Sequence, residues 1–199
     1  MLTIHACEAS PETAVLVDGA HLAAVGPYEE LAADHPRARV RRWPGILTPG
    51  LLNPYGPELL EQAYHPDPRE ADRLGTEPLF GQRALALLGA DASARGASAR
   101  RGVQRLLAHG TVAVAGELRG RAALDAVRGA GLAVAARPAT LPGPASFSPV
   151  PLVLLPALAP WKPARFAVFD VPDRAALVRE GASTCVATVV GGRLVYRGR

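Results

Sequence analysis

The chain has 199 residues, of which 49% are hydrophobic and 20% charged, and its formal net charge is +4. This much apolar sequence predicts a buried core, in one compact unit or two small ones, and it excludes a disordered protein. Because the sequence has no run of about 18 uninterrupted apolar residues and does not start with a basic segment followed by an apolar one, we expect neither a membrane span nor a secretory signal. We therefore predict a cytoplasmic protein in which Cys7 and Cys185 are buried, reduced thiols.

The positive charge does not indicate a nucleic-acid partner. A nucleic-acid surface needs basic side chains interleaved with stacking aromatic rings, and only 5% of the residues are aromatic. The densest basic cluster comprises Arg37, Arg39, Arg41 and Arg42, and its alternation along a predicted strand favours a solvated face. We therefore expect no nucleic acid among the partners.

The first part of the chain predicts a hairpin, a helix and a strand. Residues 14–26 (AVLVDGAHLAAVG) are two short apolar runs joined across Asp18-Gly19, a dipeptide that tolerates the positive φ of a tight hairpin turn. Residues 27–36 have a proline at each end and predict a short helix. Residues 38–43 predict a further strand, which leads through Pro44-Gly45 into ILTPGLLN.

The middle of the chain predicts helices alternating with parallel strands. The expected helices are residues 78–89, 98–110 and 120–131, and the expected strands are residues 111–116 and 132–137. Gly110 is expected to cap the second helix. From Pro138 to Pro163 proline dominates, and since proline removes the donors of a strand ladder, only PLVLL at residues 151–155 is compatible with a strand.

The last part of the chain predicts strands again. Residues 164–171 (ARFAVFDV) form one apolar run, and residues 184–199 (TCVATVVGGRLVYRGR) predict a hairpin with Gly191-Gly192 as its two-residue turn.

Several of these segments resemble the amidohydrolase superfamily. The stretch PGLLNPYGPE at residues 49–58 resembles the first barrel strand of that superfamily, which usually reads like PGLVNAHTHLE. The N-terminal order of elements is similar to that of imidazolonepropionases, cytosine deaminases and aminodeoxyfutalosine deaminases. Residues 100–117 resemble the helix and second strand of the barrel, and residues 164–171 resemble the strand with which such proteins leave it.

The resemblance implies a particular α/β architecture. In these relatives the N-terminal and C-terminal strands pair into one small composite β-sandwich beside the barrel, so the strands around Val15, Val168 and Val189 are expected in the same β-domain. A complete (β/α)₈ barrel takes about 250 residues. We therefore predict a composite β-sandwich of residues 1–48 and 160–199, and an incomplete, truncated barrel remnant of residues 49–159.

The resemblance also implies a metal that this sequence is not expected to bind. In the superfamily two histidines of the first strand hold the catalytic metal, but Tyr55 and Pro57 occupy those positions here. Proline has no donor atom and a neutral tyrosine is a poor ligand beside imidazole. The remaining histidines are His5, His21, His35, His65 and His109, and none forms an HxH or HExxH pair. We expect no metal, no cofactor and no catalytic residue.

Four residues are candidates for a remaining binding cleft. Asn53 and Tyr55 end the first barrel strand, and Glu117 directly follows the strand TVAVA, on the side where barrel enzymes keep their chemistry. His65, in YHPDPRE, is two residues from a carboxylate, although its prolines favour a loop over a site. A buried tyrosine hydroxyl needs a partner, for which Glu117 or a backbone group is expected.

The sequence favours a non-catalytic amidohydrolase-like protein with a binding, scaffolding or regulatory role. The alternative is a zinc-dependent hydrolase of carbon–nitrogen bonds other than peptide bonds, acting on a small cyclic amide, amidine or aminopurine-like compound. That enzyme would use an improvised site around Tyr55, His65 and Glu117, or ligands from a second chain. Because an incomplete barrel leaves strand edges and apolar surface open, we expect a homodimer or a protein partner, with a small-molecule ligand possible and no membrane contact.

Overall fold

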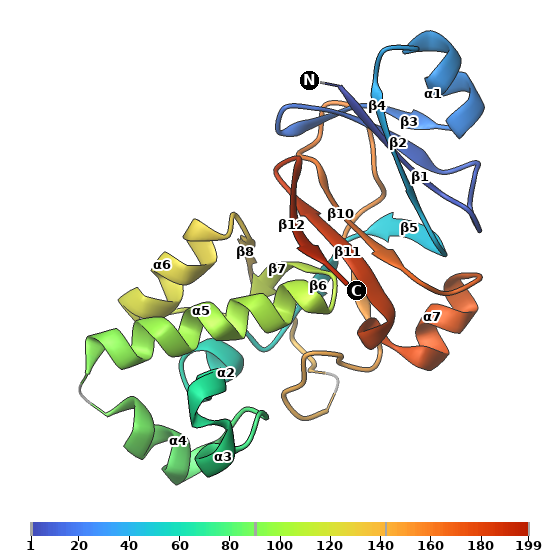
Figure 1. Cartoon of the computed structure of the whole chain (residues 1–199). Coiled ribbons are helices and arrows are strands. Elements are labelled where there is room, and N and C mark those ends of the chain that lie inside the picture. The colour runs from blue at the N-terminus through green and yellow to red at the C-terminus, as the bar shows by residue number, and fades with distance from the viewer. Residues whose placement is uncertain (1, 90, 142, 199) are drawn as a thin grey trace.

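A computed structural model describes residues 2–89, 91–141 and 143–198. Figure 1 shows an upper lobe of strands from both ends of the chain and a lower lobe that contains the long helix α5. The strands form three four-stranded sheets, two in the upper lobe and one between the lobes. Among the described residues no helix is long and apolar enough to cross a membrane.

The first sheet is built from the N-terminal segment. Its strand order is β3-β2-β1-β4, with bounds His21–Gly26, Ala14–Asp18, Thr3–Cys7 and Arg39–Trp43. The predicted hairpin is present as β2 and β3, and Gly19 takes a φ of 54° in its turn. Helix α1 (Tyr28–Asp34) follows Pro27 and packs Leu31 on the outer face of this sheet.

The second sheet joins the two ends of the chain. Its order is β12-β11-β10-β5, with bounds Arg193–Arg197, Cys185–Val190, Arg165–Phe169 and Ile46–Pro49. The predicted C-terminal hairpin is present, with Gly191 and Gly192 at φ values of 56° and 72° in its turn. Strand β5 pairs with β10, so the N-terminal segment and the C-terminal strands share this sheet.

The two sheets pack on each other as a β-sandwich. Val15 of the first sheet belongs to the same buried cluster as Phe166, Val168 and Val189 of the second. Figure 1 shows the blue N-terminal strands beside the red C-terminal ones. The composite sandwich inferred from the sequence is therefore present, while the exact domain boundaries at residues 48 and 160 stay a prediction.

The third sheet is the partial barrel. Its order is β8-β7-β6-β9, with bounds Ala133–Ala135, Thr111–Ala115, Leu51–Asn53 and Val153–Leu154. Strands β6, β7 and β8 are parallel, and β9 is antiparallel to β6. Helices α5 (Ala92–Ala108) and α6 (Arg121–Gly129) pack against each other and share a buried cluster with this sheet. The described strands do not close into a barrel.

Several short helices were not predicted from the sequence. These are α2, α3 and α7 and two 3₁₀ turns, with bounds Gly56–Leu60, Ala71–Leu74, Arg174–Glu180, Pro68–Glu70 and Ala182–Thr184. Predicted helix 78–89 is present as α4 (Gly81–Leu88). Helix α5 begins before residue 98, because the Asp91 carboxylate accepts a hydrogen bond from the backbone N–H of Ser93 and caps it.

The two edges of the third sheet differ. Residues 151–155, the one stretch of the proline-rich segment compatible with a strand, supply β9, which covers the free edge of β6. At the other edge β8 ends the sheet, and Val134 in its middle is 52% exposed. The self-association expected from open edges stays a prediction, and β8 is the edge that would serve it.

Candidate functional site

Asn53 ends β6 at the position where the remnant cleft was predicted. Its side chain is buried, with Oδ1 accepting a hydrogen bond from the Tyr55 backbone N–H at 3.0 Å. Its Nδ2 donates to the backbone oxygen of Ser146 at 2.9 Å. The amide therefore ties the end of the strand to the proline-rich segment and is not presented to solvent.

Tyr55 lies in the same buried layer. It is 2% exposed, and its hydroxyl donates a 2.6 Å hydrogen bond to the backbone oxygen of Gly143. Of the two partners predicted for this hydroxyl, the backbone group is correct and Glu117 is wrong. Both polar side chains at the end of β6 are thus hydrogen-bonded to one segment, residues 143–148, which we call the covering segment.

Pro57 is a packing residue in the first turn of α2. A Cβ atom on Gly116, which has a φ of 108°, would lie 2.7 Å from Pro57 Cδ. The proline ring therefore packs directly against the end of β7. This position contributes apolar contact where the superfamily pattern would have an imidazole.

His65 is fully buried beneath α5. Its Nε2 lies 2.7 Å from the backbone oxygen of Leu59, which only accepts, so Nε2 carries the proton and donates. Nδ1 is buried and has no hydrogen-bond partner among the described residues. Burial lowers the pKa of His65 to about 4; the hydrogen bond to Leu59 opposes this, and Arg105 and Arg101 lower it further. The imidazole is therefore neutral at physiological pH.

The loop around His65 is held to α5 by its backbone. The His65 N–H donates to Ser98 Oγ at 2.9 Å, and Arg101 Nε donates to the His65 oxygen at 2.7 Å. Arg101 also forms an ion pair with Asp67 at 3.4 Å. The Asp67 carboxylate thus holds the loop against α5 through Arg101, and it is not a second ligand beside the imidazole.

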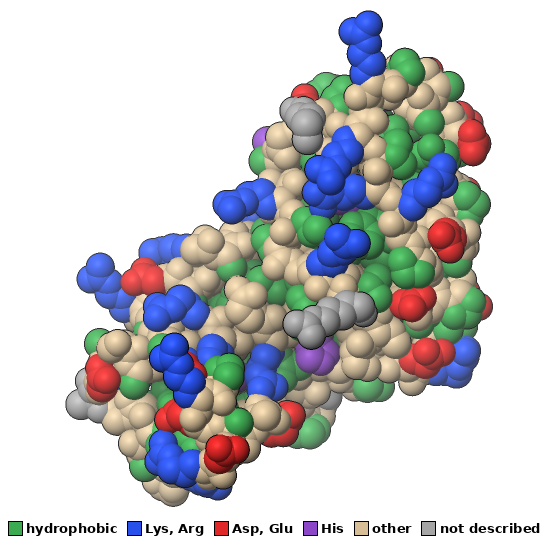
Figure 2. All heavy atoms as spheres, viewed as in Figure 1, with side chains coloured by type: hydrophobic (Ala, Val, Ile, Leu, Met, Phe, Trp, Pro, Cys, Tyr) green, Lys and Arg blue, Asp and Glu red, His purple; other side chains and the backbone are tan. Residues whose placement is uncertain are grey.

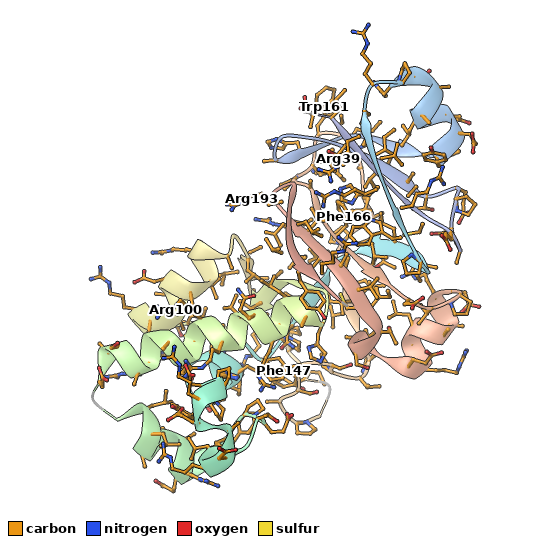
Figure 3. The ribbon with its side chains drawn as sticks, in the orientation of Figure 1. Arg39, Arg100, Phe147, Trp161, Phe166 and Arg193 are labelled. Carbon is orange, nitrogen blue, oxygen red and sulfur yellow. The ribbon has the colours of Figure 1, made fainter. Side chains whose placement is uncertain are left out.

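Phe147 fills the space between two histidines. Its ring centroid lies 5.8 Å from that of His65 and 5.7 Å from that of His109, the residue that ends α5. Figure 3 shows Phe147 beneath the C-terminal part of α5. The covering segment therefore places an aromatic side chain against His65 as well as backbone oxygens over Asn53 and Tyr55.

Glu117 does not join the other three candidates. Its side chain is 75% exposed, and its carboxylate forms an ion pair with Arg119 at 2.9 Å. An exposed pair of this kind contributes little to stability. The structure thus brings Asn53 and Tyr55 together under the covering segment, places His65 nearby against Phe147, and leaves Glu117 at the surface.

The donor groups here do not fit a catalytic metal. The Tyr55 hydroxyl and His65 Nε2 are hydrogen-bonded to backbone oxygens. His65 Nδ1 keeps a free lone pair, but one imidazole is not a metal site, and no three His, Cys, Asp or Glu side chains among the described residues group together as ligands. The thiols are no better placed, because burial raises the pKa of Cys7 to about 12 and that of Cys185 to about 11. No step of a metal-dependent reaction can be assigned to these residues.

Replacing Tyr55 by phenylalanine tests whether the Tyr55 hydroxyl is hydrogen-bonded to the covering segment. Tyr55→Phe removes the hydroxyl donor and leaves the Gly143 oxygen without it, so we expect the free energy of unfolding to fall by about 1 kcal/mol. The control is Tyr28→Phe, whose hydroxyl has no hydrogen-bond partner in the described parts of the chain and whose loss should be close to neutral. Urea denaturation measures both, and equal effects of the two variants would contradict the assignment.

Three residues that contact His65 were not predicted from the sequence: Ser98, Gly102 and Phe147. Gly102 did carry a signal, because a glycine inside a helix costs about 1 kcal/mol relative to alanine and indicates a close approach. A Cβ atom there would lie 2.7 Å from His65 Nε2. Phe147 had no such signal, since it lies in an irregular proline-rich segment.

Comparison with known proteins supports the composite domain. Residues 14–38 match the model of the imidazolonepropionase-like composite domain of bacteria. These residues are the β2–β3 hairpin, helix α1 and the turn that follows it, so the resemblance predicted from the sequence is confirmed for this part of the chain. A search of curated protein sequences found no match.

Solved structures give a partial likeness. Ochratoxinase of A. niger is 18% identical with a TM-score of 0.41, and the match covers 67% of this chain and 30% of that one. N-isopropylammelide isopropylaminohydrolase of Burkholderia multivorans is 15% identical with a TM-score of 0.44, covering 67% and 36%. Guanine deaminase of Bradyrhizobium japonicum is 19% identical with a TM-score of 0.35, covering 61% and 27%. The match spans about a third of each of these proteins, and at these TM-scores the likeness carries no argument about function.

Proposed function

We propose that this chain, whose residues 14–38 match an imidazolonepropionase-like composite domain, is a non-catalytic amidohydrolase-like protein with a binding or regulatory role. One observation carries the proposal. Asn53 and Tyr55, at the end of the first parallel strand, are both hydrogen-bonded to the backbone of the covering segment.

The chemistry of the remaining candidates supports this proposal. Hydrolysis needs an activated water or nucleophile and a group that moves a proton within hydrogen-bond reach of it. His65 is neutral and packed between Leu59 and Phe147, and Glu117 is paired with Arg119 at the surface. These groups do not converge on a common point, so they cannot act as an acid and a base on one substrate.

A cavity elsewhere offers room for a small ligand. It has a volume of about 480 Å³, within the range of small-molecule sites. The walls are mostly apolar and come from both sheets of the sandwich, from residues 155–158 and from the start of α7. The polar groups come from Ser10, Glu12, Thr13, Thr48, Asp173 and Arg174. A ligand in the remnant cleft would first have to displace the covering segment, whereas this cavity is already open.

Elemental analysis tests the proposal directly. We expect purified protein to contain far less than one equivalent of zinc or iron, including protein expressed with added zinc. The Tyr55 hydroxyl is hydrogen-bonded to a backbone oxygen, and no three His, Cys, Asp or Glu side chains among the described residues group together as ligands. Near-stoichiometric metal that is lost in Tyr55→Phe, His65→Gln or Glu117→Gln would overturn the proposal. The carbon–nitrogen hydrolase would then replace it, and cyclic amides, amidines and aminopurines would be the substrates to assay.

A further inference from the structure

Arginines from both sheets of the sandwich line one cavity far from the covering segment. The cavity has a volume of about 230 Å³ and lies between β4, an edge strand of the first sheet, and β12, an edge strand of the second. Its lining is formed by Arg39, Arg41, Arg42, Trp43, Leu194 and Arg197. We call it the arginine pocket. Lys and Arg side chains gather on this part of the upper lobe in Figure 2, and Figure 3 labels Arg39 between β12 and the N-terminal strands.

Among the residues that the structure describes, the arginine pocket has no counter-charge. No Asp or Glu lines it, and within the described residues none of its four arginines takes part in an ion pair. Two of them rest on aromatic rings instead: Arg42 lies 4.5 Å from the centroid of Tyr28, and Arg197 lies 5.9 Å from that of Trp43. Because Arg42 lies on Tyr28, on the α1 side of β4, the uncompensated positive charge of the pocket comes mainly from Arg39, Arg41 and Arg197.

Arg41 is the most constrained of the four. It is only partly exposed, and its Nε is buried without a hydrogen-bond partner among the described residues. Burial lowers the pKa of Arg41, and the neighbouring Arg39 and Arg197 lower it further. His5, opposite Arg41 on β1, has its pKa lowered to about 4 by burial first and then by Arg41 and Arg39. The prediction of a solvated arginine face is correct for Arg39 and Arg42, which are exposed, but not for Arg41.

A bound oxyanion would neutralise the positive charge of the arginine pocket and would accept a hydrogen bond from the unpartnered Arg41 Nε. Guanidinium groups bind phosphate through paired N–H donors, and a buried, unpaired donor is costly. We propose that the arginine pocket binds a small, multiply charged oxyanion, the phosphate group of a phosphorylated metabolite or free phosphate. Its volume is below that of typical whole-cofactor sites, so the pocket is suited to the anionic head group, with Trp43 and Leu194 as an apolar wall.

Thermal unfolding and calorimetry with inorganic phosphate test this proposal. At constant ionic strength, phosphate should raise Tm in a saturable way and chloride should not, because only a multivalent oxyanion bridges several guanidinium groups. Arg41→Gln should weaken phosphate binding by about tenfold or more, the effect of losing a charge-assisted hydrogen bond. It should also melt no lower than the wild type in chloride, since it removes repulsion from Arg39 and Arg197.

The control variant is Arg193→Gln. Arg193 is exposed at the start of β12 and does not line the pocket, so phosphate binding should be retained. Equal stabilisation by phosphate and chloride, or equal weakening by the two substitutions, would overturn the proposal. Tight, salt-dependent binding of duplex DNA that phosphate does not displace would overturn it as well.

A phosphorylated sugar distinguishes the two sources of the oxyanion. If the sugar phosphate binds more tightly than inorganic phosphate, the ligand is a phosphorylated metabolite, and equal affinities identify free phosphate.

Discussion

Lowering the pH from 7.5 to 5 is expected to reduce the free energy of unfolding by several kcal/mol. Two fully or almost fully buried histidines, His5 and His65, cause this sensitivity, because burial lowers the pKa of each from 6.5 to about 4. The charged form of each is disfavoured in the folded state first by burial and then by two nearby arginines. His5 faces Arg41 and Arg39, and His65 is enclosed beneath α5 near Arg105 and Arg101.

The sign follows from which state binds the proton first. As the pH falls below 6.5 the unfolded chain protonates its histidines, while the folded protein keeps them neutral down to about pH 4. The contribution of these two histidines to the free energy of unfolding is therefore constant above about pH 7 and is lost as the pH falls through this window. At about 1.4 kcal/mol per pH unit, each histidine removes about 2 kcal/mol by pH 5 and about 3 kcal/mol by pH 4.

Urea denaturation at pH 7.5 and pH 5 measures the effect, with His5→Gln, His65→Gln and the double variant. Glutamine can accept the hydrogen bond that Trp43 Nε1 donates to His5 Nδ1 at 3.2 Å, and it can donate to the Leu59 oxygen in place of His65. Each single variant should lose about half of the histidine-dependent change, and the double variant should lose nearly all of it. A pH dependence that survives in the double variant would contradict the assignment.

Gly102→Ala is expected to destabilise the protein by about 1–3 kcal/mol, although alanine favours a helix more than glycine does. The added Cβ atom would lie 2.7 Å from His65 Nε2 and 2.9 Å from Leu60 Cδ2. Both neighbours are buried, and His65 is also fixed by its hydrogen bond to Leu59. The clash is therefore not relieved by a side-chain rotation into solvent.

Gly96→Ala on the same helix is the matched control. Its Cβ atom would meet only Arg100 NH1, at 3.3 Å, and this is the end of a flexible, exposed side chain. We expect Gly96→Ala to stabilise the protein by about 0.5–1 kcal/mol, the ordinary gain of alanine in a helix. Chemical denaturation compares the two, and stabilisation by both substitutions would show that His65 is not packed against Gly102.

The candidate site was predictable only in part. The sequence shows that Tyr55 and Pro57 lack the donors that the superfamily pattern requires, and this needs no coordinates because it is a property of the side chains. Asn53, Tyr55 and Glu117 were expected to line one cleft from their places near strand ends, with His65 as a further candidate in a loop. Glu117 instead pairs with Arg119 at the surface. The sequence did not indicate whether the Glu117 carboxylate would point into the cleft or towards this arginine two residues later.

The sequence by itself determined the two hairpins, the helices that cover the third sheet and the union of the chain's two ends in one sandwich. The hairpins and helices depend on local signals, such as Asp18-Gly19 and Gly191-Gly192 in tight turns, and on apolar periodicity. The union of the two ends was implied by the resemblance to the superfamily. Only the tertiary structure decided that the proline-rich segment covers β6 and places Phe147 against His65, and that Arg41 and Arg197, from two different sheets, line one cavity. Such contacts join residues far apart in the chain, and an irregular segment or an edge strand carries no periodic signal that names its distant partner.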